Sequence, residues 1–295
     1  METLLTYLEA RRRLIDRHID LHLPPAAQEP RVVHACMRYS LLGGKRLRPL
    51  ITLAVAEMLV CPAEKVLPTC VAIECIHTHS LILDDLPCMD DDDYRRGRPT
   101  SHKQFGEGIA LLAADALLNL AITLLGRNHC LAGIAPETAL EIIRESGEAV
   151  GTDGMIGGQV ADLLFAAAGQ GDLAASLEQI HLGKTSRLFR LSARVAALVA
   201  GATPAQLEAV TAYAISLGLA FQIVDDILDE AEAREDAGRP RGRGGQPSYV
   251  AAHGSARAQA LAEAATEQAV KALTCFDVEA AILRALAAYN LARDR

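Results

Sequence analysis

The 295-residue sequence has no tryptophan, and aromatic residues make up only 4% of it. Sustained alternation of β-branched residues is also missing, which argues against a β-sheet protein. The chain is instead 51% hydrophobic and rich in alanine and leucine, which favour helices. Neither a repeat nor a linker interrupts it, so the composition predicts a single all-helical domain over residues 1–295.

Cysteine pairs of the CxxC type are absent, and the seven cysteines are scattered. This pattern favours reduced thiols in a cytoplasmic protein. The net charge of −8 argues against general binding to nucleic acid. The most apolar stretch, residues 109–125, is interrupted by Asp115 and Asn119, so we expect a buried helix and no membrane span. The N-terminus shows no signal-peptide pattern.

Helical periodicity, punctuated by glycine and proline, predicts the elements of the chain. Gly43 and Gly44 are expected to end one helix, and Gly157 and Gly158 to break another. Residues 230–248, rich in glycine, proline and charge, predict a surface loop. The expected helices cover residues 31–42, 49–60, 64–83, 108–125, 136–150, 172–180, 185–200, 204–228 and 255–290.

Two aspartate clusters each follow an apolar helical segment. Asp84, Asp85 and Asp90 have the spacing DDxxxxD, and FQIVDDILD (221–229) contains DDxxD. Asp225 and Asp229 share one helical face, because they are four residues apart. Carboxylates gathered in this way repel each other unless a cation neutralises them, and hard oxygen ligands suit magnesium. A solvated acidic helix end is the alternative for any single pair, and we assign Asp91, Asp92 and Asp93 to it.

Basic residues follow the first cluster and lie in two other segments of the chain. Arg95 and Arg96 follow the first, Lys45, Arg46 and Arg48 lie in GGKRLRP, and Lys184 precedes Thr185. Arginine binds phosphate through a bidentate fork and lysine as a point charge, so this set could bind diphosphates. Taken singly, each residue could be a surface charge.

Five blocks in order resemble the trans-isoprenyl diphosphate synthases, the family of farnesyl and geranylgeranyl diphosphate synthases. The likeness covers about residues 36–229. One DDxxD alone is a weak signal, whereas the ordered set is specific. The blocks are GGKRLRP (43–49), SLILDDLPCMDDDDYRRGRPT (80–100), MIGGQVADL (155–163), GKT (183–185) and FQIVDDILD (221–229).

The resemblance implies an orthogonal all-α helix bundle around a deep central cavity, usually as a homodimer. It implies condensation of isopentenyl diphosphate with an allylic diphosphate, with three magnesium ions. The implied catalytic residues are Asp84, Asp85, Lys184, Thr185 and Asp225. The implied metal ligands are Asp84, Asp85, Asp90, Asp225 and Asp229. The implied contacts to the allylic diphosphate are Arg95, Lys184 and Gln222, with Thr185 facing the developing cation. The implied contacts to isopentenyl diphosphate are Gly44, Lys45, Arg48, His77 and Arg96.

Product length in this family often depends on the residue five before the first aspartate, which is His79 here, next to Ser80. Tyrosine at that position typically stops the product at fifteen carbons. Histidine is smaller, and the position lies roughly 7.5 Å along a helix from Asp84. The resemblance therefore favours geranylgeranyl diphosphate, with farnesyl diphosphate as the alternative. A core histidine bonded to a backbone carbonyl is the other interpretation of His79.

The sequence departs from the family after Asp229, where two lysines are usual. Here the loop has no lysine, and Arg239, Arg241 and Arg243 are candidate substitutes. This departure keeps open a non-catalytic subunit of such an enzyme. A terpene cyclase is disfavoured by GGKRLRP and the Arg95-Arg96 pair, and a di-iron bundle by the absence of Glu-x-x-His pairs.

Overall fold

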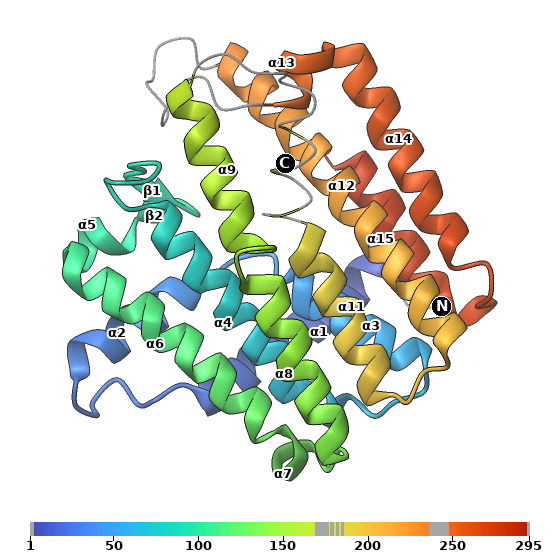
Figure 1. Cartoon of the computed structure of the whole chain (residues 1–295), viewed down its shortest axis with the longest axis horizontal. Helices are drawn as coiled ribbons and strands as arrows, with labels where there is room; N and C mark the ends of the chain where they lie inside the picture. Colours follow the sequence, from blue (N-terminus) through green and yellow to red (C-terminus); the bar gives the residue numbers. More distant parts are fainter. Residues whose placement is uncertain are drawn as a thin grey trace. The chain divides into compact units, whose positions relative to one another are not determined.

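The computed structural model describes residues 3–168, Leu177, Ile180, Gly183, residues 186–235 and residues 248–293. Within these residues nearly all regular structure is helical, which confirms the all-α prediction (Figure 1). The strands described form one two-stranded antiparallel hairpin. The internal contacts divide the chain into two units, and each is described by itself. The prediction of a single domain stays a prediction.

The first unit consists mainly of Met1–Leu53 and Pro62–Ile143. Its central element is α4, of which 14 of 18 residues are buried, and α6 lies alongside it (Figure 1). Such continuous burial explains why α4 is apolar all round rather than on one stripe. The elements lying wholly in this unit are α1 (Leu4–His22), α2 (Arg31–Leu41), η1 (Ala63–Lys65), α4 (Leu67–Asp84), β1 (Tyr94–Arg95), β2 (Arg98–Pro99), α5 (Ser101–Phe105), α6 (Glu107–Gly126) and α7 (Asn128–Ala132).

The second unit consists of Ala54–Cys61, Arg144–Pro240 and Gly244–Arg295. Its longest helix, α12, packs against α11, α14 and α15 (Figure 1). The buried Tyr213 hydroxyl donates to the Leu283 carbonyl at 2.8 Å and so ties α12 to α15. Two helices, α3 (Leu47–Met58) and α8 (Pro136–Val150), contribute to both units. The remaining elements are α9 (Met155–Ala168), α11 (Arg187–Val199), α12 (Pro204–Glu235), α13 (Tyr249–His253), α14 (Ser255–Ala272), η3 (Val278–Ala280) and α15 (Ala281–Ala292).

Several predicted element boundaries are wrong. The N-terminal helix α1 was not expected, and the helix expected over 255–290 is two helices separated by residues 273–280. Helix α12 continues to Glu235, so the second aspartate cluster lies inside a helix and residues 230–235 are helical where a loop was predicted. Residues 236–247 of the predicted loop lie outside the described residues. Most of the helix expected over 172–180 lies outside the described residues.

Gly157 and Gly158 do not break a helix, because α9 begins at Met155 and runs through both. A Cβ atom on Gly157 would lie 2.0 Å from the Thr152 carbonyl oxygen, which is impossible without backbone movement. Glycine is therefore required here by a close backbone approach rather than by a helix end. Gly43 and Gly44, in contrast, follow α2 with φ angles of 76° and 88°, as a helix end requires.

By length and composition alone, α6 and the Pro204–Ala231 part of α12 could cross a membrane. This is weak evidence, since core helices of globular proteins meet the same criterion. The absence of a membrane span stays a prediction.

Candidate active site

The first aspartate cluster lies where α4 ends. Asp84 is the last residue of α4 and Asp85 is its C-cap, and both side chains are buried. The chain then turns back, so that the Asp90 amide donates to the Asp84 carbonyl at 2.9 Å. This hydrogen bond closes the loop of the DDxxxxD motif. The backbone thus brings Asp84 and Asp90 together across five intervening residues.

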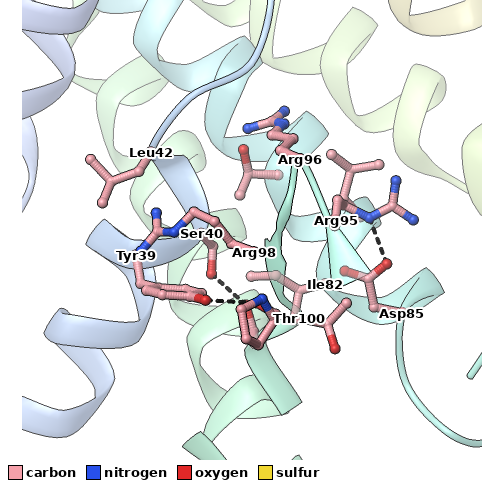
Figure 2. A pocket seen from close by; sticks show the side chains of 13 residues that line it. Tyr39, Ser40, Leu42, Ile82, Asp85, Arg95, Arg96, Arg98 and Thr100 are labelled. Atoms are coloured by element: carbon pink, nitrogen blue, oxygen red, sulfur yellow. Dashed lines mark hydrogen bonds and ion pairs between the residues drawn. The ribbon is translucent and has the colours of Figure 1, made fainter. Parts of the chain in front are cut away.

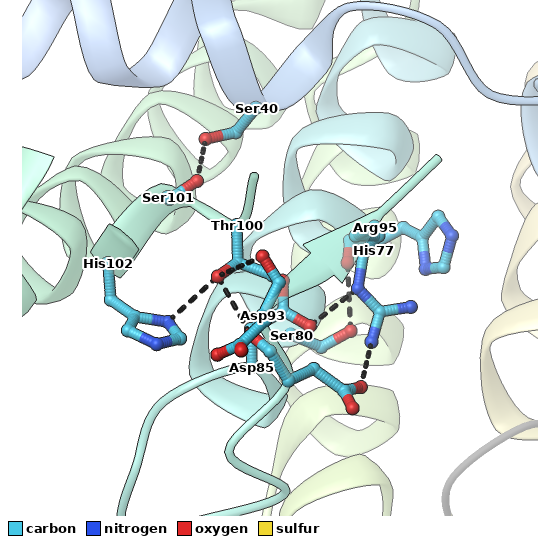
Figure 3. Close-up of polar contacts among 10 residues, drawn as sticks. Ser40, His77, Ser80, Asp85, Asp93, Arg95, Thr100, Ser101 and His102 are labelled. Atoms are coloured by element: carbon cyan, nitrogen blue, oxygen red, sulfur yellow. Dashed lines mark hydrogen bonds and ion pairs between the residues drawn. The ribbon is translucent and has the colours of Figure 1, made fainter. Parts of the chain in front are cut away.

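Asp85 is paired with Arg95 from strand β1, with 2.6 Å between Arg95 Nε and Asp85 Oδ1 (Figures 2 and 3). Burial raises the pKa of Asp85 to about 6, although Arg95 opposes the shift. Arg95 also reaches Asp92 at 3.4 Å. Asp93 pairs with Lys103 at the surface, which agrees with the solvated role expected for it.

The β1–β2 hairpin carries two residues predicted to bind phosphate, Arg95 at the end of β1 and Arg96 in the tight turn that follows. Arg96 and Gly97 join β1 to β2, with φ angles of 54° and 72°, as a two-residue type I′ turn requires. Arginine is unusual in a left-handed conformation, and such strain is often found at functional positions. The Thr100 hydroxyl donates to the Asp92 carbonyl at 2.8 Å and fixes the base of the hairpin (Figure 3).

The guanidinium of Arg96 lies against the backbone of Gly44. A Cβ atom on Gly44 would lie 2.6 Å from Arg96 Cζ, so any other residue at position 44 would require the guanidinium to move. Arg96 Nη1 is 3.4 Å from the Gly43 carbonyl oxygen. Two sequence blocks, GGKRLRP and YRRGRP, are therefore in direct contact.

The three basic residues of GGKRLRP have different surroundings. Arg46 is buried, with φ 54°, and its guanidinium pairs with buried Glu74 at 2.7 Å and with Asp16 at 2.8 Å. It is thus a structural residue that holds the loop in place. Lys45 is exposed and Arg48 is half-buried, as residues that bind an anionic ligand should be.

His77 accepts a hydrogen bond from Arg48, with 3.3 Å between Arg48 Nη1 and His77 Nε2. Burial lowers the pKa of His77 well below its usual value, and Arg48 and Arg96 lower it further. The imidazole is therefore neutral, and it orients Arg48 without adding to the positive charge.

A small cavity lies between the hairpin and α2 (Figure 2). Arg95 and Arg96 line it, and Arg98 stacks on the Tyr39 ring at 4.0 Å. The Tyr39 hydroxyl donates to the Pro99 carbonyl at 2.7 Å. Sequence reasoning missed Tyr39 and Arg98. The RRGRP run was a signal for Arg98, whereas nothing in the sequence indicated Tyr39.

His79 is buried and donates from Nδ1 to the Ala114 carbonyl of α6 at 3.0 Å. Burial lowers its pKa. This contact is the one expected for a core histidine, and the role of His79 in product length stays a prediction. The Ser80 hydroxyl donates to the His77 carbonyl at 2.8 Å, within α4 (Figure 3).

The second aspartate cluster lies on α12 in the other unit. Asp226 is buried and accepts hydrogen bonds from the Tyr249 amide at 2.7 Å and from Gln222 Nε2 at 3.0 Å. Burial raises the pKa of Asp226 to about 6. Asp226 therefore anchors α13 to α12, while Asp229, the predicted ligand, is exposed.

Asp225 is paired with Arg293, which follows α15, with 2.5 Å between Asp225 Oδ1 and Arg293 Nη2. Sequence reasoning missed this arginine, which is 68 residues away. Lys184 and Thr185 lie outside the described residues, as do Arg239, Arg241 and Arg243.

No group of three or more histidine, cysteine, aspartate or glutamate side chains in the described residues could hold a metal ion alone. The predicted ligands are nevertheless all carboxylates, the donor type that magnesium prefers. Magnesium usually binds one or two carboxylates and takes further oxygens from water and substrate phosphates. The chemistry of the donor set therefore fits magnesium bound together with a diphosphate.

Comparison with known proteins decides the family. A model of the polyprenyl synthetase family matches residues 30–285. The chain belongs to the polyprenyl synthetase family. This polyprenyl synthetase is 39% identical to geranylgeranyl pyrophosphate synthase 11 of Arabidopsis thaliana, over 98% of this chain and 82% of that one. It is 38% identical to geranylfarnesyl diphosphate synthase of Leucosceptrum canum, over 98% and 80%.

A solved structure shows the same fold. The FPP/GFPP synthase of Zymomonas mobilis superposes on this polyprenyl synthetase with a TM-score of 0.87 at 36% identity, covering 98% of this chain and 99% of that one. The family resemblance and the isoprenoid-synthase fold class predicted from the five sequence blocks are therefore confirmed.

Proposed function

We propose that the chain is a trans-prenyltransferase that condenses isopentenyl diphosphate with an allylic diphosphate and makes geranylgeranyl diphosphate. The observation that carries this proposal is the packing of Arg96 against Gly44 beside the Asp85–Arg95 pair. This contact brings the cationic hairpin and the GGKRLRP loop together, next to the carboxylates at the end of α4. The names of the relatives support the reaction class.

Each group in the first unit has a separate task. Arg95, partly exposed and already paired with Asp85, binds the allylic diphosphate at the carboxylate cluster. Lys45, Arg48 and Arg96 bind isopentenyl diphosphate, and neutral His77 orients Arg48. Magnesium bound at the aspartates would stabilise the negative charge that develops on the leaving diphosphate.

The chemical step joins two carbon atoms. The allylic carbon–oxygen bond breaks, and both electrons leave with the diphosphate. The double bond of isopentenyl diphosphate forms the new carbon–carbon bond, and loss of one proton restores a neutral hydrocarbon chain. The departing diphosphate is the base in this proposal, so the protein supplies charge and exclusion of water rather than a proton acceptor.

A product of twenty carbons is favoured by histidine at position 79 and by the Arabidopsis relative. The Leucosceptrum and Zymomonas relatives carry names with other products, so residue 79 is the position to test. We expect His79→Tyr to shorten the product, because the larger ring fills space beside α6. An unchanged product distribution would remove His79 from the determination of chain length.

The decisive experiment is product analysis with the purified chain. Magnesium and isopentenyl diphosphate are supplied with the five-, ten- or fifteen-carbon allylic diphosphate, and the dephosphorylated products are identified by mass. Geranylgeraniol supports the proposal, whereas farnesol alone indicates a shorter cavity. No product from any starter would instead favour a non-catalytic subunit.

Asp84→Ala tests the carboxylate assignment. We expect turnover to fall by about two orders of magnitude or more, because a predicted metal ligand is lost. Asp93→Ala is the matched control, since Asp93 lies in the same aspartate run but pairs with Lys103 at the surface. A near-normal rate for Asp84→Ala would contradict the magnesium assignment.

The proposal includes a cytoplasmic location, a homodimer and no binding of nucleic acid. All seven cysteines lie in the described residues and are free thiols, as a reducing compartment allows. The net charge of −8 disfavours a polyanionic partner outside the cationic site.

A further inference from the structure

The contact between Arg293 and Asp225 joins the end of α15 to α12. Arg293 Nη2 lies 2.5 Å from Asp225 Oδ1 and 3.2 Å from the Phe221 carbonyl oxygen. The guanidinium also covers the Phe221 ring, 4.3 Å from its centroid. We call Arg293, Phe221 and Asp225 the C-terminal latch. Phe221 and Asp225 are one helical turn apart, so one guanidinium reaches both.

The latch buries a full positive charge. Only 6% of the Arg293 side chain is exposed, against 34% for Asp225. Among the described residues, Asp225 is the one carboxylate paired with Arg293, and Arg293 Nε has no hydrogen-bond partner there. A buried charge that loses its partner is strongly destabilising. Arg293 is therefore held in place mainly by the negative charge of Asp225.

The first unit offers a comparison. Arg95 is paired with Asp85, but 32% of the Arg95 side chain is exposed, so its guanidinium can move into water, provided that another cation then neutralises buried Asp85. Arg293 cannot leave Asp225 without a movement of the chain at the end of α15. The two aspartate clusters thus have counter-ions of different mobility.

We propose that Arg293 is a resident counter-cation that competes with a divalent ion for Asp225, so that metal binding and release of the C-terminal segment are coupled. This inference rests on the proposed function, because it takes Asp225 to be a metal ligand. A divalent ion on the carboxylate repels the guanidinium across a few ångströms, and a displaced Arg293 is not stable in its buried position. Two states follow, one latched and metal-free, the other unlatched and metal-bound.

The coupling is reciprocal by thermodynamic linkage. A change that weakens the latch must tighten metal binding, and metal binding must weaken the contact between Arg293 and Asp225 by the same factor. Coupling between two sites typically amounts to fivefold or more in affinity.

Metal binding to the full chain is measured with Mn²⁺ at a fixed concentration of inorganic diphosphate, because the carboxylates would hold the ion together with phosphate oxygens. Calorimetry and the magnetic resonance signal of free Mn²⁺ measure it, against a blank of Mn²⁺ and diphosphate without protein. Arg293→Gln removes the charge, and Arg293→Lys keeps the charge but loses the fork and the ring contact. Arg284→Gln is the matched control, because Arg284 lies on α15, the helix that Arg293 follows. Within the part of the chain that the structure describes, it bonds backbone carbonyls alone, those of Leu273, Phe276 and Asp277.

We expect Arg293→Gln to lower the dissociation constant for Mn²⁺ about fivefold or more, Arg293→Lys to have a smaller effect, and Arg284→Gln to have none. Hydrogen exchange of residues 281–293 should rise when Mn²⁺ binds to the unmodified chain. Equal affinities in all variants, or unchanged exchange on metal binding, would overturn the latch.

The variant Asp225→Asn distinguishes a failure of the latch from a failure of the proposed metal-ligand role of Asp225. If it weakens Mn²⁺ binding while Arg293→Gln has no effect, the ligand assignment holds and the latch is wrong. If it leaves Mn²⁺ binding unchanged, Asp225 is not a ligand and both ideas fail at this position.

Discussion

The position of the Arg96 guanidinium depends on the absence of a side chain at Gly44. We expect Gly44→Ala to lower kcat/KM for isopentenyl diphosphate about tenfold, or roughly 1.4 kcal/mol, because the new Cβ atom displaces the Arg96 guanidinium. The loss should appear mainly in KM. Steady-state kinetics with isopentenyl diphosphate as the varied substrate measure it.

Gly43→Ala is the control for this prediction. Gly43 has a similar φ angle of 76°, but its Cβ atom would lie 3.9 Å from Arg96, which is ordinary contact. It therefore adds backbone strain without moving Arg96. Equal kinetic losses in the two variants would attribute the effect to strain and contradict a role for the Arg96 position.

Neighbouring residues in GGKRLRP show what the sequence could not predict. Lys45, Arg46 and Arg48 were equivalent as sequence, yet Arg46 points inward to Glu74, 28 residues away. The inward orientation depends on a tertiary ion pair and on a left-handed backbone at an arginine. Neither follows from local spacing, whereas the helix expected over 64–83 ends within one residue of the end of α4 at Asp84, since Pro87 cannot continue a helix.

Helices α3 and α11 end in the same hydrogen-bonded motif, but its left-handed position is Val60 in one and Gly201 in the other. At the end of α3, the Val60 and Cys61 amides donate to the Glu57 and Ala56 carbonyls, a Schellman motif, and Val60 has a φ angle of 57°. We expect Val60→Gly to raise the free energy of unfolding by about 1 kcal/mol. Relief of left-handed strain exceeds the entropy that glycine adds to the unfolded chain. Urea denaturation measures the change.

Helix α11 provides the reverse test, because Gly201 occupies the same position of the same motif with a φ angle of 70°. A Cβ atom on Gly201 meets no neighbour within 4 Å, so Gly201→Val tests strain alone. It should destabilise the protein by about 1–2 kcal/mol. If both substitutions shift the unfolding midpoint in the same direction, the assignment of strain is wrong.

Helix boundaries were predictable where a local signal sets them. The end of α2 at a glycine pair was expected, but Gly157 and Gly158 look the same in sequence and lie inside α9. In α9 Gly157 is needed because the backbone of Thr152 approaches closely, a contact that periodicity does not show.

Helix α6 gives the whole molecule an exposed apolar surface. Leu111, Leu112 and Ile122 are 45%, 54% and 53% exposed. If this surface forms the proposed homodimer, Leu112→Glu should give a monomer, because symmetry buries two unpaired charges at each interface. Light scattering coupled to size exclusion measures the mass.

Val278→Glu is the control, because Val278 is 80% exposed on η3, an element of the second unit. It should leave the dimer intact. A monomeric unmodified chain, or a Leu112→Glu variant that remains dimeric, would contradict this role for α6.

For the molecule as a whole, the order of five sequence blocks predicted the protein family, and the comparisons confirmed that family. It did not predict that Arg293 pairs with Asp225, because 68 residues separate them and the basic C-terminal residue has no motif around it. Contacts of this kind depend on where α15 packs on α12.

The stacking of Arg293 on Phe221 also has a spectroscopic consequence. The chain has no tryptophan, so Phe221→Trp would give it a single indole beneath the guanidinium. A nearby cation and a change in solvent contact both alter indole emission. One fluorescence signal, free of background from other tryptophans, would then follow the position of Arg293 in solution and in real time.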